Sequence, residues 1–361
     1  MFTAADRESM ARALRLAERG LFTTTPNPRV GCVIVRGGEV VGEGFHERAG
    51  EAHAEVNALR AAGARADGAT AYVTLEPCVH HGRTPPCVEA LLTARVKRVV
   101  VAMGDPNPKV SGRGFAALRA AGIEVAAGLL EDEARELNVG FVSRMTRGRP
   151  WVRLKVASTL DAKTALASGE SQWITGETAR RDGHLWRARA CAILTGIGTV
   201  KDDDPRLTVR DVETPRQPLR VLVDSRLEVP LAARILEGGH VLVAAAIEDR
   251  ARIDALRARG AEVVVLPNAA GKVELADLVR ELGRRALNEI HVEAGFKLNG
   301  SLVAAGVVDE LLVYIAPKVL GESARGMFNL RGVDRLADAR RLRLMDVERI
   351  GEDVRLRARF G

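Results

Sequence analysis

Glu51-Ala52-His53-Ala54-Glu55 is the stretch around which this chain is organised, together with Leu75-Glu76-Pro77-Cys78 and Pro86-Cys87 further along. These stretches supply one imidazole, two thiols and a carboxylate that need not be a metal ligand. Three protein ligands of this kind, with a fourth position open to water, are typical of a catalytic zinc site. A zinc ion lowers the pKa of bound water from about 15.7 to about 7. Glu55, two residues after the histidine, is then placed to carry protons.

The order H-x-E followed by P-C is the signature of zinc deaminases that act on cytosine or adenine. That signature ends with two closely spaced cysteines, whereas residues 79–86 separate Cys78 from Cys87 here. Taken singly, His53 could be a buried helix residue, and each cysteine a small apolar core residue. Their ordered combination favours zinc, with His80 and His81 in the intervening loop as rival ligands.

Composition indicates a two-domain protein of a reducing compartment. The chain has 361 residues, of which 47% are hydrophobic, and its four cysteines are too scattered for a disulfide framework. No signal peptide or long apolar segment is evident, so we expect a cytoplasmic protein with no membrane partner. The net charge of +7 comes mainly from arginines spread among acidic residues. This pattern favours a solvated surface or a phosphate-bearing small ligand over nucleic acid.

The hydrophobic pattern predicts two successive α/β domains, 1–146 and 150–361, joined by a basic Gly- and Pro-containing segment. In the first domain we expect His53 and Glu55 in the first turn of a helix, Cys87 at the start of another, and a final helix over 132–145. The predicted strands of the two domains are 30–35, 40–45, 72–75, 99–102, 123–126, 152–157, 192–195, 219–223, 241–245, 263–266, 289–292 and 311–315. The alternating residues 354–358 predict a half-exposed edge strand.

The second domain carries weaker signals of its own. Gly196 and Gly198 follow a strand, but the third glycine of a dinucleotide-binding loop is missing. Glu293 and Gly295 stand at the carboxyl end of a predicted strand, where α/β sheets commonly bind ligands.

At the level of motifs the chain resembles the bifunctional riboflavin-biosynthesis deaminase/reductase family. The first half carries Thr25-Pro-Asn-Pro-x-Val-Gly31, Gly44-Phe-His-x-x-Ala-Gly50, His53-Ala-Glu55, Leu75-Glu-Pro-Cys-x-His-His-Gly-Arg-Thr-Pro-Pro-Cys87 and Asp105-Pro-Asn-Pro-x-Val-x-Gly-x-Gly114. The second half carries Lys155-Val-Ala-x-Thr-Leu-Asp161, Ser168-Gly-Glu-Ser-Gln-Trp-Ile-Thr175, Gly196-x-Gly-Thr-Val-x-x-Asp-Asp-Pro-x-Leu207 and Val292-Glu-Ala-Gly295. The resemblance implies a cytidine-deaminase-like three-layer αβα domain followed by a dihydrofolate-reductase-like α/β domain. The long loop between the cysteines is a feature of this family.

For the first domain, the resemblance implies zinc held by His53, Cys78 and Cys87, with Glu55 as proton donor. The implied reaction is hydrolytic deamination of 2,5-diamino-6-ribosylamino-4(3H)-pyrimidinone 5′-phosphate, which releases ammonia and leaves a uracil. The residues in substrate-facing motifs are Asn27, His46, His81, Asp105 and Asn107. Each of these could instead form a turn.

For the second domain, the resemblance implies NADPH-dependent reduction of the ribosyl group to a ribityl side chain. The implied NADPH contacts are Ala157, Trp173, Thr199, Asp203, Ser225 and Gly295. The implied substrate contacts are Ser171, Arg187, Leu207, Arg210 and Glu293. Arginine suits a phosphate group, and either Lys155 or Glu293 could assist opening of the sugar ring by proton transfer.

Two other hypotheses compete with a two-activity enzyme. One is a base deaminase that binds RNA through its second half, although aromatic residues make up only 4% of the chain. The other is a zinc deaminase whose second domain is catalytically silent and structural. For the leading hypothesis we expect a phosphorylated pyrimidine as substrate, and a homo-oligomer, either a dimer or a tetramer.

Overall fold

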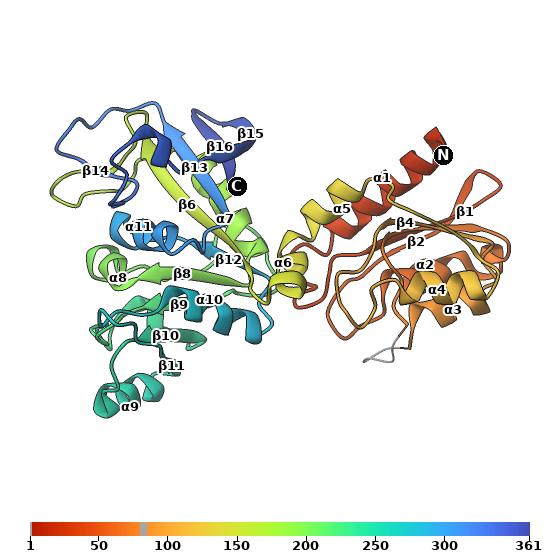
Figure 1. Ribbon diagram of the computed structural model, residues 1–361, viewed down its shortest axis with the longest axis horizontal. Coiled ribbons are helices and arrows are strands. Elements are labelled where there is room, and N and C mark those ends of the chain that lie inside the picture. The colour runs from red at the N-terminus through yellow and green to blue at the C-terminus, as the bar shows by residue number, and fades with distance from the viewer. Residues whose placement is uncertain (1, 80–84) are drawn as a thin grey trace. The chain divides into compact units, whose positions relative to one another are not determined.

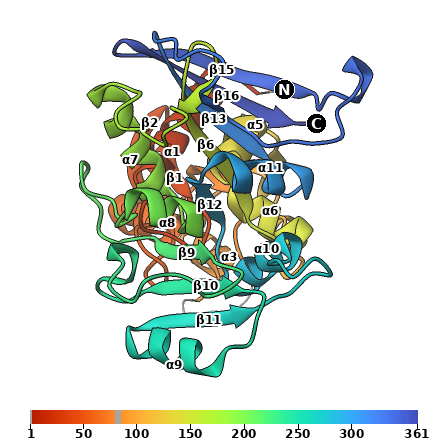
Figure 2. The same ribbon diagram turned by 90° about the vertical axis from the view of Figure 1, so that its left-hand side faces the viewer.

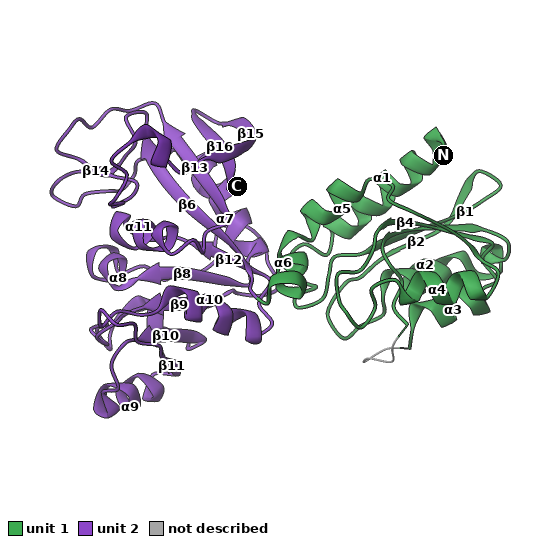
Figure 3. Cartoon of the chain, viewed as in Figure 1, with its two compact units in different colours: residues 1–148 green, residues 149–361 purple. Residues whose placement is uncertain are grey.

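The computed structural model describes residues 2–79 and 85–361, and the chain divides into two compact units, residues 1–148 and 149–361 (Figure 3). Each unit contains its own mixed β-sheet with helices between its strands in the sequence, which confirms the predicted α/β fold class. Among the described residues, no helix combines the length and apolar character needed to cross a bilayer.

Unit 1 is a five-stranded sheet in the order β2-β1-β3-β4-β5, with helices on both faces. Its strands are β1 (Gly31–Arg36), β2 (Glu39–Phe45), β3 (Thr70–Leu75), β4 (Arg98–Met103) and β5 (Glu124–Ala127). Its helices are α1 (Ala4–Glu18), α2 (Ala54–Ala62), α3 (Cys87–Thr93), α4 (Arg113–Ala120), α5 (Glu131–Leu137) and α6 (Val139–Arg147). Figure 1 shows α1 and α5 on one face and α2, α3 and α4 on the other, a three-layer arrangement.

Two glycines of β2 bring helix α2 close to the sheet. A Cβ atom at Gly42 would lie 2.3 Å from the carbonyl oxygen of Ala58, and one at Gly44 would lie 2.6 Å from that of Ala54. Any larger residue at either position would push α2 outward. Because His53 and Glu55 lie at the start of α2, these glycines set the distance of the candidate metal site from the sheet.

Unit 2 contains a nine-stranded sheet in the order β11-β10-β9-β8-β12-β6-β13-β16-β15, and β7 pairs separately with β14. Its strands are β6 (Trp151–Thr159), β7 (Lys163–Ala165), β8 (Ala192–Gly196), β9 (Leu219–Val223), β10 (Val241–Ala245), β11 (Ala261–Val265), β12 (Glu289–Val292), β13 (Glu310–Ala316), β14 (Arg325–Gly326), β15 (Leu342–Ile350) and β16 (Asp353–Phe360). Its helices are α7 (Glu177–Arg189), α8 (Ile197–Asp203), α9 (Arg250–Ala258), α10 (Leu275–Arg284) and α11 (Phe296–Ala304).

The two faces of this sheet are covered differently. Figure 2 shows α10 and α11 on one face, where their leucines and valines join the largest apolar core of the unit, and α7 on the other. Beneath α7 the sheet buries charge: the Arg153 guanidinium donates to Glu310 at 2.6 Å and to Glu289 at 3.2 Å. Arg189 of α7 donates to the same Glu289 carboxylate at 2.7 Å. The Arg189–Glu289 pair fixes α7, and therefore Arg187 on that helix, against the sheet.

Three sequence-based expectations about the elements are wrong. The helix expected over 132–145 is two helices, because the side chain of buried Asn138 bonds the backbone of Arg29 and the chain turns there. The strand expected at the sheet edge over 354–358 lies inside it, since β16 pairs with both β13 and β15. His53 is not in the first turn of α2 but precedes it as the N-cap residue.

Candidate active sites

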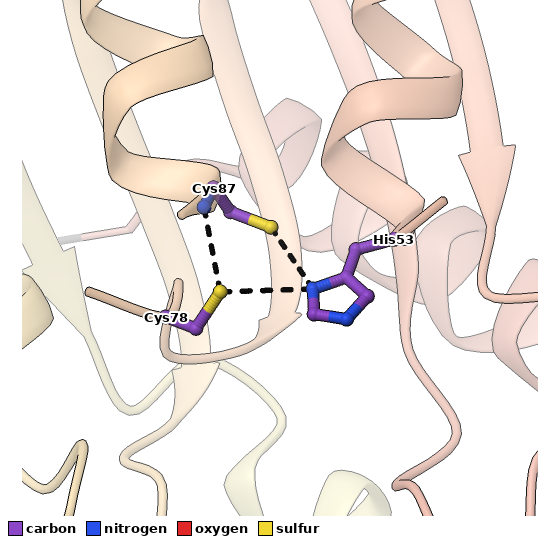
Figure 4. Close-up of side chains that lie close together, drawn as sticks. All are labelled: His53, Cys78 and Cys87. Atoms are coloured by element: carbon purple, nitrogen blue, oxygen red, sulfur yellow. Dashed lines mark hydrogen bonds between the residues drawn. The ribbon is translucent and has the colours of Figure 1, made fainter. Parts of the chain in front are cut away.

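Three side chains predicted as metal ligands converge in unit 1. Cys78 follows β3, Cys87 begins α3 and His53 precedes α2, so two helix N-termini meet at this point (Figure 4). The Nδ1 atom of His53 lies 3.2 Å from Cys87 Sγ and 3.6 Å from Cys78 Sγ. All three potential ligand atoms lie within 4.8 Å of one another. The rival His80 lies outside the described residues, as does His81.

This donor set fits zinc. With Zn–S bonds of about 2.3 Å and Zn–N bonds of about 2.05 Å, tetrahedral geometry requires N···S separations of about 3.6 Å. The observed separations of 3.2 and 3.6 Å are close to that requirement. Two thiolates and one imidazole are also ligands that zinc prefers, and a set of three leaves one position for water or substrate.

The electrostatics of the cluster favour a thiolate at Cys78. Its pKa falls to about 4, chiefly because the Cys87 thiol donates a hydrogen bond to it and because His53 lies beside it. The backbone N–H of Cys87, at the start of α3, also donates to Cys78 Sγ at 3.3 Å. The pKa of Cys87 rises because its proton bonds the neighbouring sulfur. A bound dication would displace that proton.

Glu55 is 3% exposed and lies next to the cluster without belonging to the ligand set. Burial raises its pKa, and the nearby Cys78 thiolate raises it further. A carboxyl with a raised pKa accepts and returns protons near neutral pH more readily than an ordinary one.

His46 and Asn27 form a second layer beside the cluster. The ring of His46 meets that of His53 edge-on at 5.2 Å between centroids. Its Nδ1 atom lies 3.1 Å from the carbonyl oxygen of Ala52, and its Nε2 atom lies 3.1 Å from the Asn27 amide nitrogen. The carbonyl can only accept, so Nδ1 donates and Nε2 accepts from Asn27. Burial lowers the pKa of His46, which matches this neutral form.

Asp105 and Asn107 lie in the segment after β4. The Asn107 backbone N–H donates to Asp105 Oδ1 at 2.8 Å. Burial raises the pKa of Asp105 to about 6, and the Glu76 and Cys78 charges act in the same direction. Asp105 therefore shares the electrostatic environment of the metal cluster.

Unit 2 contains a cavity of about 1220 Å³ that extends over the carboxyl ends of β6, β8, β9 and β12. The predicted reductase residues all line it: Lys155, Ala157, Ser171, Trp173, Arg187, Thr199, Asp203, Leu207, Arg210, Ser225, Glu293 and Gly295. These residues span 140 positions of sequence between Lys155 and Gly295 (295 − 155). The fold therefore gathers them into one place large enough for a dinucleotide and a second ligand.

Glu293 is the charged centre of this cavity. Burial would raise its pKa, but the Arg187 guanidinium and the Lys155 ammonium hold it well below its usual range. Arg187 binds both carboxylate oxygens of Glu293, one of them at 2.8 Å, and donates to the carbonyl oxygen of Thr208 at 3.1 Å. Burial lowers the pKa of Lys155, and Glu293 only partly opposes this. Arg187 is thus committed to Glu293, which the sequence pattern did not reveal.

Further cations line the same cavity and were not predicted as site residues. They are Arg180, Lys201, Arg206, Arg226, Arg234, Lys272, Lys297 and Arg325. The basic net charge was the one sequence signal for them, but it did not say which arginines and lysines would gather.

Comparisons with known proteins match both units. Residues 3–103 match the cytidine and deoxycytidylate deaminase zinc-binding region, and residues 150–356 match the RibD C-terminal domain. The chain is 52% identical to the riboflavin biosynthesis protein RibD of Escherichia coli K12, over 97% of this chain and 98% of that one. It is 44% identical to the Aquifex aeolicus RibD, over 97% of both.

Solved structures agree along the whole chain. An Acinetobacter baumannii RibD structure superposes with a TM-score of 0.92 at 47% identity and 99% coverage of both chains. A Thermotoga maritima deaminase/reductase superposes with a TM-score of 0.88 at 33% identity, also over 99% of both chains.

Fold and sites together define a bifunctional enzyme, a zinc-dependent deaminase joined to an NADPH-dependent reductase. The chain belongs to the RibD family of riboflavin biosynthesis. The hypothesis of a catalytically silent second domain finds no support, because the match to RibD reductase structures covers that domain in full.

Proposed function

We propose that residues 1–146 deaminate and residues 150–361 then reduce one phosphorylated pyrimidine. The Thermotoga maritima relative is described as a diaminohydroxyphosphoribosylaminopyrimidine deaminase and 5-amino-6-(5-phosphoribosylamino)uracil reductase. We assign the same substrates to this chain. The observation that carries the proposal is the pairing, in one chain, of the His53, Cys78 and Cys87 cluster with a cavity built around Glu293.

In the deaminase, His53, Cys78 and Cys87 would hold zinc. A zinc ion held there would supply an activated water for attack on the ring carbon that bears the amino group. Glu55 would take one proton from that water and give it to the ring nitrogen; it would then take the remaining hydroxyl proton and deliver it to the amino group, which leaves as ammonia. Its raised pKa and its burial beside the cluster support this role. Asn27, His46, Asp105 and Asn107 hold the pyrimidine.

We also propose His81 as a fifth contact to the pyrimidine, because it stands in the same family motif as Cys78 and Cys87. This residue lies outside the described part of the chain.

In the reductase, bound NADPH would supply a hydride for the C1′ carbon of the opened sugar. Lys155 is the better candidate for proton donor to the ring oxygen, because burial lowers its pKa, whereas Arg187 keeps Glu293 as a carboxylate. The negative charge of Glu293 holds the Lys155 side chain in place and stabilises the positive charge that develops at C1′. Arg210 binds the phosphate, since Arg187 already uses both of its parallel N–H groups on Glu293. Ser171 and Leu207 complete the substrate contacts.

The NADPH contacts are proposed at Ala157, Trp173, Thr199, Asp203, Ser225 and Gly295. Gly295 is the N-cap of α11, and that helix N-terminus offers backbone N–H groups to a pyrophosphate.

We further propose a cytoplasmic homo-oligomer. Strand β15 is one of the two edge strands of its sheet among the described strands, and it exposes Leu344 (56%) and Val347 (57%). Edge strands with exposed apolar side chains favour pairing with a second chain. Light scattering on the purified protein measures the oligomeric state, and a strictly monomeric mass would refute this part.

Two variants test the division of labour. Glu55→Gln should abolish ammonia release and leave NADPH oxidation with the deaminated intermediate unchanged. Glu293→Gln should do the reverse. Loss of both activities in either variant would contradict the assignment of one reaction to each domain.

A further inference from the structure

Glu76 is a buried carboxylate that the two reactions described above do not use. It lies between the end of β3 and Cys78, and it is 3% exposed. Its Oε2 atom accepts backbone N–H bonds from Asp105 at 3.1 Å and Gly112 at 3.0 Å. Its Oε1 atom accepts from Gly114 at 2.9 Å and Phe115 at 3.3 Å. A carboxylate offers about four acceptor positions, so these four donors account for its capacity.

The four donors come from the two ends of one segment, residues 105–115. Asp105 begins the segment after β4, whereas Gly112, Gly114 and Phe115 lie at its other end, where α4 starts. Gly114 approaches so closely that a Cβ atom there would lie 2.3 Å from the Pro77 carbonyl oxygen and 3.0 Å from Glu76 Oε1. One side chain thus ties both ends of the segment to the strand that leads into the metal cluster.

The same segment carries two of the proposed substrate contacts. Asp105 is fixed at its own backbone N–H by Glu76, and its carboxylate in turn accepts the Asn107 N–H. The charge of Cys78 contributes to the raised pKa of Asp105, so this part of the segment interacts electrostatically with the metal cluster.

We propose that Glu76 is a positioning residue for deamination, which holds Asp105 and Asn107 at the metal site by fixing both ends of segment 105–115. This inference rests on the proposed substrate-facing role of those two residues. A glutamine in place of Glu76 keeps the shape of the side chain but turns half of its acceptor capacity into N–H donors. Two of the four backbone N–H groups then face donors instead of an acceptor.

The expected effect falls on substrate binding. Displacing binding groups by about 1 Å can cost about a hundredfold in rate, and hydrogen bonds to a charged acceptor are about twice as strong as neutral ones. In Glu76→Gln we expect the KM for ammonia release to rise at least about tenfold, with a smaller change in kcat. Zinc content and NADPH oxidation with the deaminated intermediate should match those of the unaltered enzyme.

The experiment measures these four quantities in the full-length, zinc-loaded enzyme. Glu39→Gln is the matched control, because Glu39 is an exposed glutamate of β2 in the same unit. Gly114→Ala is a second variant that moves the same segment without altering the carboxylate, and it should raise KM in the same way. Should Glu76→Gln fail to fold, Gly114→Ala alone decides the question.

A double-mutant cycle with Asn107→Ala identifies the route of the effect. If Glu76 acts through the segment, adding Glu76→Gln to Asn107→Ala should change KM far less than Glu76→Gln does alone. An unchanged KM in zinc-loaded Glu76→Gln, additive effects in the cycle, or a loss of zinc would overturn the positioning role. An unchanged KM in Asn107→Ala would instead refute the substrate contact on which the inference rests, and both would fall.

Discussion

Replacing Arg187 with lysine should impair the reductase and shift its pH dependence. Arg187 and Glu293 are 15% and 16% exposed, and the guanidinium binds both carboxylate oxygens. Lysine keeps the charge but cannot form two parallel hydrogen bonds. Losing one hydrogen bond to a charged partner costs about 1.5–3 kcal/mol. At about 1.4 kcal/mol per factor of ten, the reductase kcat/KM should fall about 10- to 100-fold.

The direction of the pH shift follows from the opposing influences on Glu293. Arg187 is the main influence that keeps its pKa well below the usual range, against burial. Weakening that influence lets burial raise the pKa, so the carboxylate is protonated at a higher pH. The acid side of the reductase profile should therefore move to higher pH in the variant.

The assay is NADPH oxidation with the deaminated intermediate, measured across pH. Arg181→Lys is the matched control, since Arg181 is an exposed arginine of the same helix. Ammonia release should be unchanged, because Arg187 lies in unit 2 and the deaminase residues lie in unit 1. An unchanged kcat/KM and an unchanged pH profile would refute the role assigned to the Arg187 and Glu293 pair.

Two other predictions concern unit 1. Cys87→Ser should lower the amount of zinc bound per chain, because an alcohol is a poorer zinc ligand than a thiolate. Metal analysis after dialysis measures this amount, and an unchanged zinc content would implicate His80 or His81 as the third ligand. Asp6→Asn should destabilise unit 1 by about 1.5–3 kcal/mol near neutral pH, because buried Asp6 accepts from Arg98 at 2.7 Å and from Tyr72 at 2.8 Å. Burial acts to raise the pKa of Asp6, but these bonds hold it below the unfolded value of about 3.9. The stabilisation is therefore present above about pH 3.9 and is lost as the pH falls through the folded pKa. Denaturant unfolding should show the gap between the two proteins narrowing in acid, and a gap that widens would contradict the ion pair.

The metal site could be predicted from sequence because its residues stand in short motifs, although His53 and Cys87 are 34 positions apart. His53 and Glu55 are two residues apart, and Cys87 begins α3 as the apolar pattern predicted. The position of Glu76 is visible in the same motif, but its partners are backbone N–H groups of residues 105–115. Any residue except proline has a backbone N–H donor, so no sequence pattern could reveal the four hydrogen bonds that Glu76 accepts.

The reductase cavity could not be derived from local patterns. Arg187 and Glu293 meet across 106 positions of sequence, and the glycines Gly196 and Gly198 gave only a weak signal. The resemblance in motifs supplied residues that the fold then gathered around one cavity. The outer strand β15 was missed because its residues are mostly exposed and charged residues interrupt its apolar ones.

The central claim is that one chain performs both reactions in sequence, and one measurement tests it most directly. The purified enzyme is given NADPH and only the undeaminated ribosylaminopyrimidine phosphate, so that NADPH is consumed only after deamination. We predict consumption by the unaltered enzyme, none by Glu55→Gln, and recovery in that variant when the deaminated intermediate is added. No consumption with either substrate would contradict the account and leave the second domain without its reaction.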